Sequence, residues 1–165
     1  MAIVVEDGTG KSDAVSYVTV AYADAYHLAR GNTSWTGADA VKEAALIRAT
    51  DYLDGKYSTR WPGTRESTTQ ALDWPRVNAY DVDNYILSDV PEGVKKAICE
   101  SALVELVDAG ALSEEQDRGG QVAREVVGPI ETEYFAGAPA STVYPAIARC
   151  LSRILGPTGL RMVRV

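Results

Sequence analysis

Residue types that commonly build catalytic or metal sites are scarce in this sequence. Its 165 residues include one histidine, two cysteines, two methionines and one phenylalanine. No serine, cysteine or second histidine stands in motif relation to His27, and Cys99 and Cys150 lie too far apart for any zinc-site spacing. We therefore expect a protein that is not an enzyme and that holds neither a metal nor a cofactor.

Long hydrophobic runs and an excess of basic residues are also missing. No stretch approaches the roughly 18–20 apolar residues of a membrane span, and the start MAIVVEDGTG lacks the features of a signal peptide. We expect a soluble cytoplasmic protein with reduced cysteines and no membrane contact. The 16 Lys and Arg against 23 Asp and Glu give a net charge of −7, which disfavours a protein that wraps DNA. A net negative charge is still compatible with a protein that surrounds a DNA channel without binding the DNA, because the negative surface repels the phosphates.

Two stretches resemble binding motifs but lack an essential residue. DGTGKS is similar to the end of a phosphate-binding loop, but Val5 stands where the first glycine is required, and no good helix follows. DVDNYILSDVPE is similar to a calcium loop, with Asp81, Asp83 and Glu92 at ligand positions, but Ile86 replaces the glycine of the sharp turn. We therefore interpret both as turns without a ligand.

Four stretches have the apolar periodicity of amphipathic helices. Their starts are marked by Thr19, by Thr36 with Asp39 three residues later, by Pro91, and by Pro145 in the first turn of the last. The expected buried faces are Ala21, Ala25, Leu28 and Ala29; Ala38, Val41, Ala45, Ala49 and Leu53; Val94, Ile98, Ala102 and Leu106; and Ile147, Cys150, Leu151 and Ile154. We predict a mainly α fold: a small bundle of about four helices with a β-hairpin, a long ordered loop and an extended tail. Residues 1–165 would form one domain, with its helical body at about 19–155.

Residues 58–90 form a long segment without helical periodicity, and a loop of this length inside a compact domain usually has a function. Two prolines and several turn-forming residues interrupt it. Trp61 and Trp74 indicate an ordered segment, because indole side chains need a surface to bury against. We predict that both tryptophans anchor this loop onto the helices or onto a neighbouring subunit.

Residues 121–135 place β-branched and charged residues on both sides of a Gly-Pro turn, a pattern that predicts a β-hairpin. A two-stranded hairpin is marginal alone, and its open edges can pair with another chain. The hairpin therefore either lies on its own domain or crosses to a neighbouring subunit. The residues expected at such a contact are Val122, Arg124, Glu125, Val126, Ile130, Glu131, Glu133 and Tyr134.

Gly156 and Pro157 end the fourth helix and leave residues 156–165 as a C-terminal tail. Chain ends are commonly frayed, but this one is more apolar than a typical disordered end. It is therefore expected either to fray or to dock on a partner. The residues available for docking are Leu160, Arg161, Met162, Val163, Arg164 and Val165.

Several stretches in order along the chain carry a resemblance to a known family. They are IVVEDGTG, SYVTVAYADAYHLARG, WTGADAVKEAALIRATDYLD, QALDWPR and GGQVAREVVGPIETEY, which together span roughly residues 3–135. This set resembles the head–tail connector (adaptor) proteins of tailed bacteriophages. The same family is often labelled DnaT-like single-stranded DNA-binding protein.

The connector resemblance implies a structural virion protein without catalytic residues. Its subunits would form a ring, expected to be dodecameric, beneath the portal protein and above a tail-side neck or terminator protein. Genomic DNA would pass through without specific binding. The tail residues 156–165 would dock on the portal, the hairpin would contact a neighbouring subunit, and the protein would lie in the host cytoplasm during assembly.

The alternative is a DnaT-like single-stranded DNA-binding or replication module. Such a protein needs basic residues interleaved with aromatic ones, and only the region around residues 56–85 offers this combination. The basic residues are Lys56, Arg60, Arg65 and Arg76, and the aromatic ones are Tyr57, Trp61, Trp74, Tyr80 and Tyr85. This region is where we expect any DNA contact.

Overall fold

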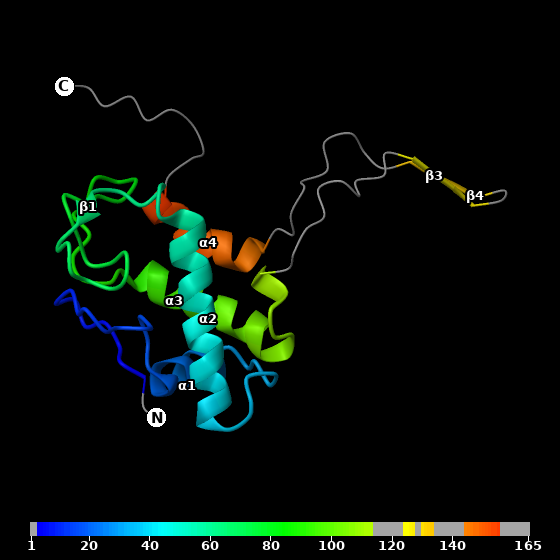
Figure 1. Cartoon of the computed structure of the whole chain (residues 1–165), viewed down its shortest axis with the longest axis horizontal. Coiled ribbons are helices and arrows are strands. Elements are labelled where there is room, and N and C mark those ends of the chain that lie inside the picture. Colours follow the sequence, from blue (N-terminus) through cyan, green and yellow to red (C-terminus); the bar gives the residue numbers. More distant parts are fainter. Residues whose placement is uncertain (1–2, 114–123, 128–129, 134–143, 156–165) are drawn as a thin grey trace.

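A computed structural model describes residues 3–113, 124–127, 130–133 and 144–155 of the chain. These residues contain the helices α1 (Val20–Leu28), α2 (Asp39–Tyr57), α3 (Glu92–Val107) and α4 (Pro145–Leu155), a short 3₁₀ helix η1 (Ala111–Ser113), and the strands β1 (Thr64–Arg65), β2 (Arg76–Val77), β3 (Arg124–Val127) and β4 (Ile130–Glu133). Figure 1 shows this mainly helical arrangement. The predicted fold class, with four helices and an antiparallel hairpin, is confirmed over the described residues.

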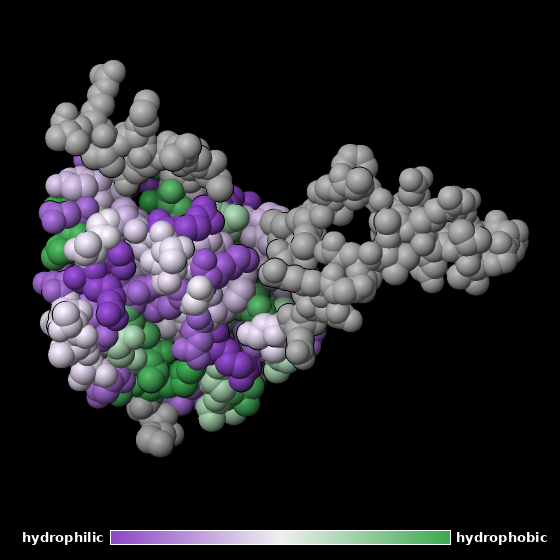
Figure 2. Space-filling view, turned by 45° about the horizontal axis from the view of Figure 1, so that its top comes forward, coloured by the Kyte–Doolittle hydropathy of each residue, from purple (hydrophilic) through white to green (hydrophobic). Residues whose placement is uncertain are grey.

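Helix α3 is the centre of the bundle, because it packs against α1, α2 and α4 (Figure 1). Its residues Val94, Ile98 and Ala102 are fully buried, as the periodicity predicts. A Cβ atom added at Gly93 would lie 2.7 Å from the Cys150 carbonyl oxygen, so the absence of a side chain permits the close approach of α3 and α4. On the face in Figure 2, hydrophobic residues form separate groups among hydrophilic ones.

The predicted buried face of α1 is wrong. Leu28 is 84% exposed, and Ala21, Ala25 and Ala29 also face solvent. Ala23, Tyr26 and His27 point inward instead. The aromatic rings bury more apolar area than alanines do, and their polar atoms find partners inside, so they occupy the interface with α3. The predicted cap is confirmed, since Thr19 Oγ1 accepts a hydrogen bond from the backbone of the first turn.

Helix α2 starts later than its capping signal predicts. It begins at Asp39 and has no side-chain cap, so the expected cap at Thr36 is wrong. Val41 in the first turn is 52% exposed and Ala38 directly before the helix is exposed as well, whereas the other three residues of the predicted stripe are buried. That buried part of the stripe consists of Ala45, Ala49 and Leu53. The helix therefore enters the bundle only after its first turn.

Helix α4 buries Ile147, Leu151 and Ile154 of its predicted face, and Cys150 is half-buried. Strands β3 and β4 pair antiparallel in the register Arg124↔Glu133 to Val127↔Ile130, as the predicted hairpin requires. Val122 and Tyr134 of the predicted contact set lie outside the described residues, as does the whole of residues 156–165. Within the described part of the chain, no helix is long and apolar enough to span a membrane.

Candidate nucleic-acid interface

An aromatic stack holds the segment of residues 58–90 against α2. Trp74 is fully buried and Trp61 is 5% exposed, and their ring centroids lie 5.9 Å apart in an edge-to-face arrangement. The ring of Tyr57, at the end of α2, lies 5.6 Å from that of Trp61. These three rings are therefore part of the core and are closed to stacking on a nucleotide base.

Polar contacts tie the same segment to the N-terminal region and to α2. The Tyr17 hydroxyl lies 2.8 Å from both carboxyl oxygens of Asp54 and accepts a hydrogen bond from the Trp74 backbone N–H at 3.1 Å. The Asp73 backbone N–H donates to Asp54 Oδ2 at 3.1 Å. Burial raises the pKa of Asp54 to about 7. The loop is thus fixed in place over the end of α2.

Arg76 is used inside the loop and is not free for a ligand. Its guanidinium donates to the carbonyl oxygens of Pro62 at 2.8 Å, Gly63 at 2.8 Å and Asp73 at 3.2 Å. Gly63 has φ +69°, and a Cβ there would lie 2.3 Å from the Val77 carbonyl oxygen. The antiparallel pair of β1 and β2 is therefore tightly packed, and the Arg76 side chain holds the surrounding backbone by hydrogen bonds.

Three other basic residues of this region remain exposed: Lys56 at the end of α2, Arg60 just beyond it, and Arg65 on β1. Among the described residues, no carboxylate lies within ion-pair distance of any of them. Lys56 donates to the Tyr52 hydroxyl, and its Nζ lies 4.8 Å from the centroid of that ring. The negative end of the α2 dipole also favours cations here. We name Lys56, Arg60 and Arg65 the cation cluster.

Basic residues elsewhere are mostly neutralised within the chain. The ion pairs of the described residues are Lys11–Asp7, Lys42–Asp24, Arg48–Glu105, Lys96–Glu92 and Arg153–Asp83. Outside the cation cluster and Arg76, the basic residues with described side chains and no ion pair are Arg30 after α1, Lys95 on α3 and Arg149 on α4.

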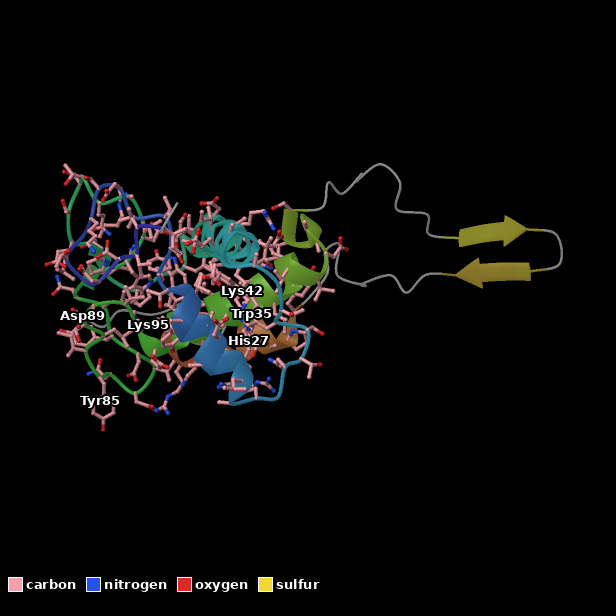
Figure 3. All side chains as sticks on the ribbon, turned by 90° about the horizontal axis from the view of Figure 1, so that it is seen from below. His27, Trp35, Lys42, Tyr85, Asp89 and Lys95 are labelled. Atoms are coloured by element: carbon pink, nitrogen blue, oxygen red, sulfur yellow. The ribbon has the colours of Figure 1, made fainter. Side chains whose placement is uncertain are left out.

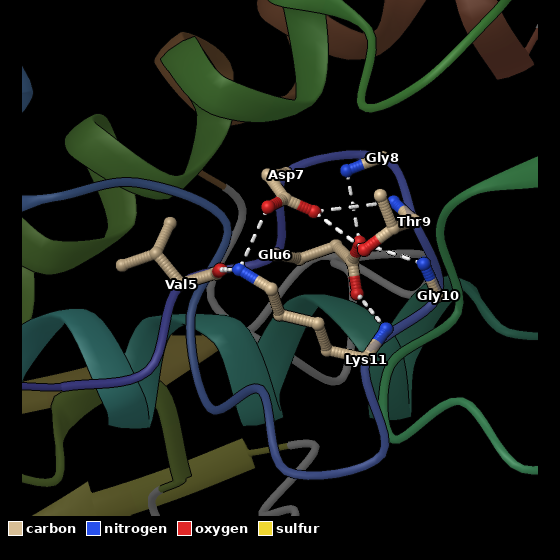
Figure 4. Close-up of polar contacts among 7 residues, drawn as sticks. All are labelled: Val5, Glu6, Asp7, Gly8, Thr9, Gly10 and Lys11. Carbon is tan, nitrogen blue, oxygen red and sulfur yellow. Dashed lines mark hydrogen bonds and ion pairs between the residues drawn. The ribbon is translucent and has the colours of Figure 1, made fainter.

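The loop that resembles a phosphate-binding loop is occupied by the chain's own carboxylate (Figure 4). Glu6 Oε1 accepts hydrogen bonds from the backbone N–H groups of Gly8 at 2.8 Å and Gly10 at 2.9 Å, and its Oε2 accepts from Lys11 at 2.8 Å. Glu6 is only 3% exposed. Lys11 Nζ donates to the Val5 carbonyl oxygen at 3.0 Å. The backbone donors that would cradle a phosphate are thus already used, and the sequence signal for this was the glutamate directly before the turn.

The acidic residues of the calcium-like stretch make separate contacts. Asp81 Oδ1 accepts from the backbone N–H groups of Asp83 at 2.9 Å and Tyr85 at 2.8 Å, which closes a turn. Asp83 also pairs with Arg153 on α4. Glu92 begins α3 and accepts from the Tyr22 hydroxyl at 2.6 Å. These carboxylates stabilise the fold at different places.

His27 is a packed core residue. Asn32 Nδ2 lies 3.0 Å from its Nδ1, and its Nε2 lies 3.2 Å from the Cys99 carbonyl oxygen. The ring is therefore neutral, with its proton on Nε2 donated to that carbonyl. Burial lowers the pKa of His27, and its ring centroid lies 4.6 Å from that of Trp35 (Figure 3). These contacts hold the segment between α1 and α2 in place.

Comparison with known families assigns a description to the whole chain. Residues 1–165 match the family described as "Putative DnaT-like ssDNA binding protein". No curated protein and no solved structure matches the chain. The interpretation as a structural head–tail connector of the virion is therefore wrong, because the matching family is described by single-stranded DNA binding and not by a position in a virus particle. The partners and the localisation that accompanied it stay predictions. The chain belongs to this DnaT-like family.

Proposed function

We propose that the protein binds single-stranded DNA and that the cation cluster of Lys56, Arg60 and Arg65 contacts the phosphates. The observation that carries the proposal is the exposure of three basic side chains, two at the end of α2 and one on β1, without carboxylate partners among the described residues. The family match supports the ligand class. Lys56 Nζ and Arg60 Cζ lie 5.9 Å and 5.4 Å from the centroid of the Tyr57 ring, and Arg65 lies on the hydrogen-bonded segment that follows.

The contact is small and electrostatic. Three neutralised phosphates give a slope of log K against log salt of about −2 for a single strand, from roughly −0.7 per phosphate. The net charge of −7 repels DNA over the rest of the surface. We therefore expect modest affinity that is independent of base sequence, because phosphate contacts carry no sequence information.

A single strand suits this surface better than a duplex. A flexible strand can bend to reach a few exposed cations, whereas a rigid duplex extends past them towards acidic regions that repel phosphates. The half-buried Tyr52, which contacts Lys56, lies directly beside the cluster and offers an aromatic edge to a base. The buried rings of Trp61 and Trp74 take no part.

Fluorescence anisotropy with a labelled oligothymidylate at low salt tests this proposal. The variant Lys56→Ala/Arg60→Ala/Arg65→Ala should lose at least about tenfold in affinity. Its affinity should also depend less on salt, because the salt dependence grows with the number of phosphates that the protein neutralises. The matched control is Lys96→Ala/Arg149→Ala/Arg153→Ala, which removes the same charge at α3 and α4. Equal losses in both variants would refute the cation cluster, and no binding by the unmodified protein would refute the function.

A further inference from the structure

The turn formed by residues 79–87 exposes an unusual amount of apolar surface. Tyr85 is 71% exposed, Ile86 69%, Val82 49% and Tyr80 37%. Figure 3 shows Tyr85 pointing away from the body of the protein. We name residues 79–87 the tyrosine turn. Exposed apolar side chains gathered in this way mark interaction sites, whereas single ones do not.

The tyrosine turn is held rigidly by its own hydrogen bonds. Tyr80 and Ile86 form an antiparallel bridge, the Leu87 N–H donates to the Ala79 carbonyl oxygen at 2.8 Å, and the Asp81 N–H donates to the Tyr85 carbonyl oxygen at 2.9 Å. A surface that is already ordered loses little conformational entropy when it binds. The turn therefore has the properties of a preformed docking surface.

The charge of the turn selects its partner. The tyrosine turn contains Asp81 and Asp83 and no lysine or arginine, Asp89 follows two residues later, and Arg153 on α4 pairs with Asp83. This excess of carboxylates repels phosphates and separates the turn from the proposed DNA contact. A segment with apolar side chains and positive charges complements it.

The C-terminal segment of the same chain starts beside this surface. The Val82 N–H donates to the Arg153 carbonyl oxygen at 2.9 Å, and the Arg153 side chain pairs with Asp83. Helix α4 ends at Leu155, so the chain leaves it next to the turn. The sequence that follows is GPTGLRMVRV, whose last six residues are four apolar residues and two arginines.

We propose that residues 156–165 dock on the tyrosine turn of their own chain. Leu160, Met162 and Val163 would cover the exposed side chains of Tyr85 and Ile86. Arg161 and Arg164 would face the carboxylates of the turn. Ten residues reach at most roughly 33–36 Å, which covers the turn from Leu155, and attachment to α4 gives the segment a high effective concentration. The proposal is independent of DNA binding.

Photo-crosslinking from position 85 tests the proposal on the full chain. Benzoylphenylalanine replaces Tyr85, and the control protein carries it at Leu28, which is 84% exposed on α1. Mass spectrometry of the digested protein should find crosslinks from position 85, but not from position 28, to residues 160–165. A mixture of ¹⁵N-labelled and unlabelled protein should give crosslinks within one isotope only.

Charge reversal provides the second arm. Arg161→Glu/Arg164→Glu in the crosslinker protein should lower the yield from position 85 at least about fivefold, because two attractions become repulsions. Absent crosslinks, equal crosslinks from position 28, mixed-isotope products or an undiminished yield after charge reversal would each overturn the proposal. Unchanged thermal unfolding of all variants shows that the comparison concerns folded protein.

Discussion

Replacing Trp74 by alanine should strongly destabilise the protein. Its side chain is fully buried, and its ring packs edge-to-face on Trp61 at 5.9 Å. A buried tryptophan-to-alanine change costs about 3–5 kcal/mol, which already includes the cavity that remains. Trp74 Nε1 makes no hydrogen bond within the described residues, so the loss comes from packing. For a domain of this size, each kcal/mol lowers Tm by about 2–4 °C, which predicts a decrease of roughly 6–20 °C.

Thermal unfolding followed by circular dichroism at 222 nm measures this loss. Trp74→Phe keeps an aromatic ring and should cost clearly less than Trp74→Ala. Because the ring also supports the loop that carries Arg65, the alanine variant should bind DNA more weakly even at temperatures where its helices are intact. A Tm for Trp74→Ala within about 2 °C of the unmodified protein would refute the packing argument.

Three further changes test separate parts of the fold. Glu6→Ala removes the acceptor of three backbone hydrogen bonds and should lower the free energy of unfolding by about 1–3 kcal/mol in urea, whereas an unchanged midpoint would show that the loop holds itself. Gly93→Ala places a Cβ 2.7 Å from a carbonyl oxygen of α4 and should cost about 1–3 kcal/mol, while Gly55→Ala, with open space around it in α2, should stabilise by up to about 1 kcal/mol; equal effects would contradict the close helix packing. Burial raises the pKa of Asp54 from 3.8 to about 7, so the unfolded state releases this proton first and the contribution of Asp54 to stability is lost as the pH rises from about 4 through 7. The free energy of unfolding of Asp54→Asn in urea should therefore increase relative to that of the unmodified protein as the pH rises through this range. A difference between the two proteins that does not change with pH would argue against the raised pKa. His27, whose pKa is lowered by burial, acts in the opposite direction below pH 6.5 and is present in both proteins.

The sequence predicts the bundle well where apolar periodicity alone decides burial. Helices α3 and α4 bury most of their predicted faces, which consist of apolar side chains, and only Leu106 and Cys150 are half-buried. Helix α1 is different. Tyr26 and His27 carry polar atoms, so a pattern of apolar residues places them on the solvent-facing side of the helix. The structure satisfies those atoms, with the Tyr26 hydroxyl donating to Glu100 at 2.6 Å and His27 bonded to Cys99 and Asn32. Long-range partners of this kind are invisible in the local pattern.

The candidate interface was identified from the sequence only as a mixture of basic and aromatic residues. Lys56, Arg60, Arg65 and Arg76 look equivalent there. The fold distinguishes them, because the Arg76 guanidinium donates hydrogen bonds to backbone carbonyls, whereas the other three side chains remain exposed. Trp61, as an aromatic residue, looked equally suitable for base stacking, but it is part of the core. Which polar groups are already used inside the molecule depends on the tertiary contacts.

The most direct test of DNA binding through the cation cluster is the affinity for single-stranded oligothymidylate over a salt series. It is measured for the unmodified protein and for the variant that lacks the three basic side chains. The unmodified protein should bind with a log–log salt slope of about −2, and Lys56→Ala/Arg60→Ala/Arg65→Ala should show a slope near zero and a large loss of affinity. Lys96→Ala/Arg149→Ala/Arg153→Ala should keep the slope of the unmodified protein. The same slope and affinity in the unmodified protein and the cation-cluster variant would contradict the central claim.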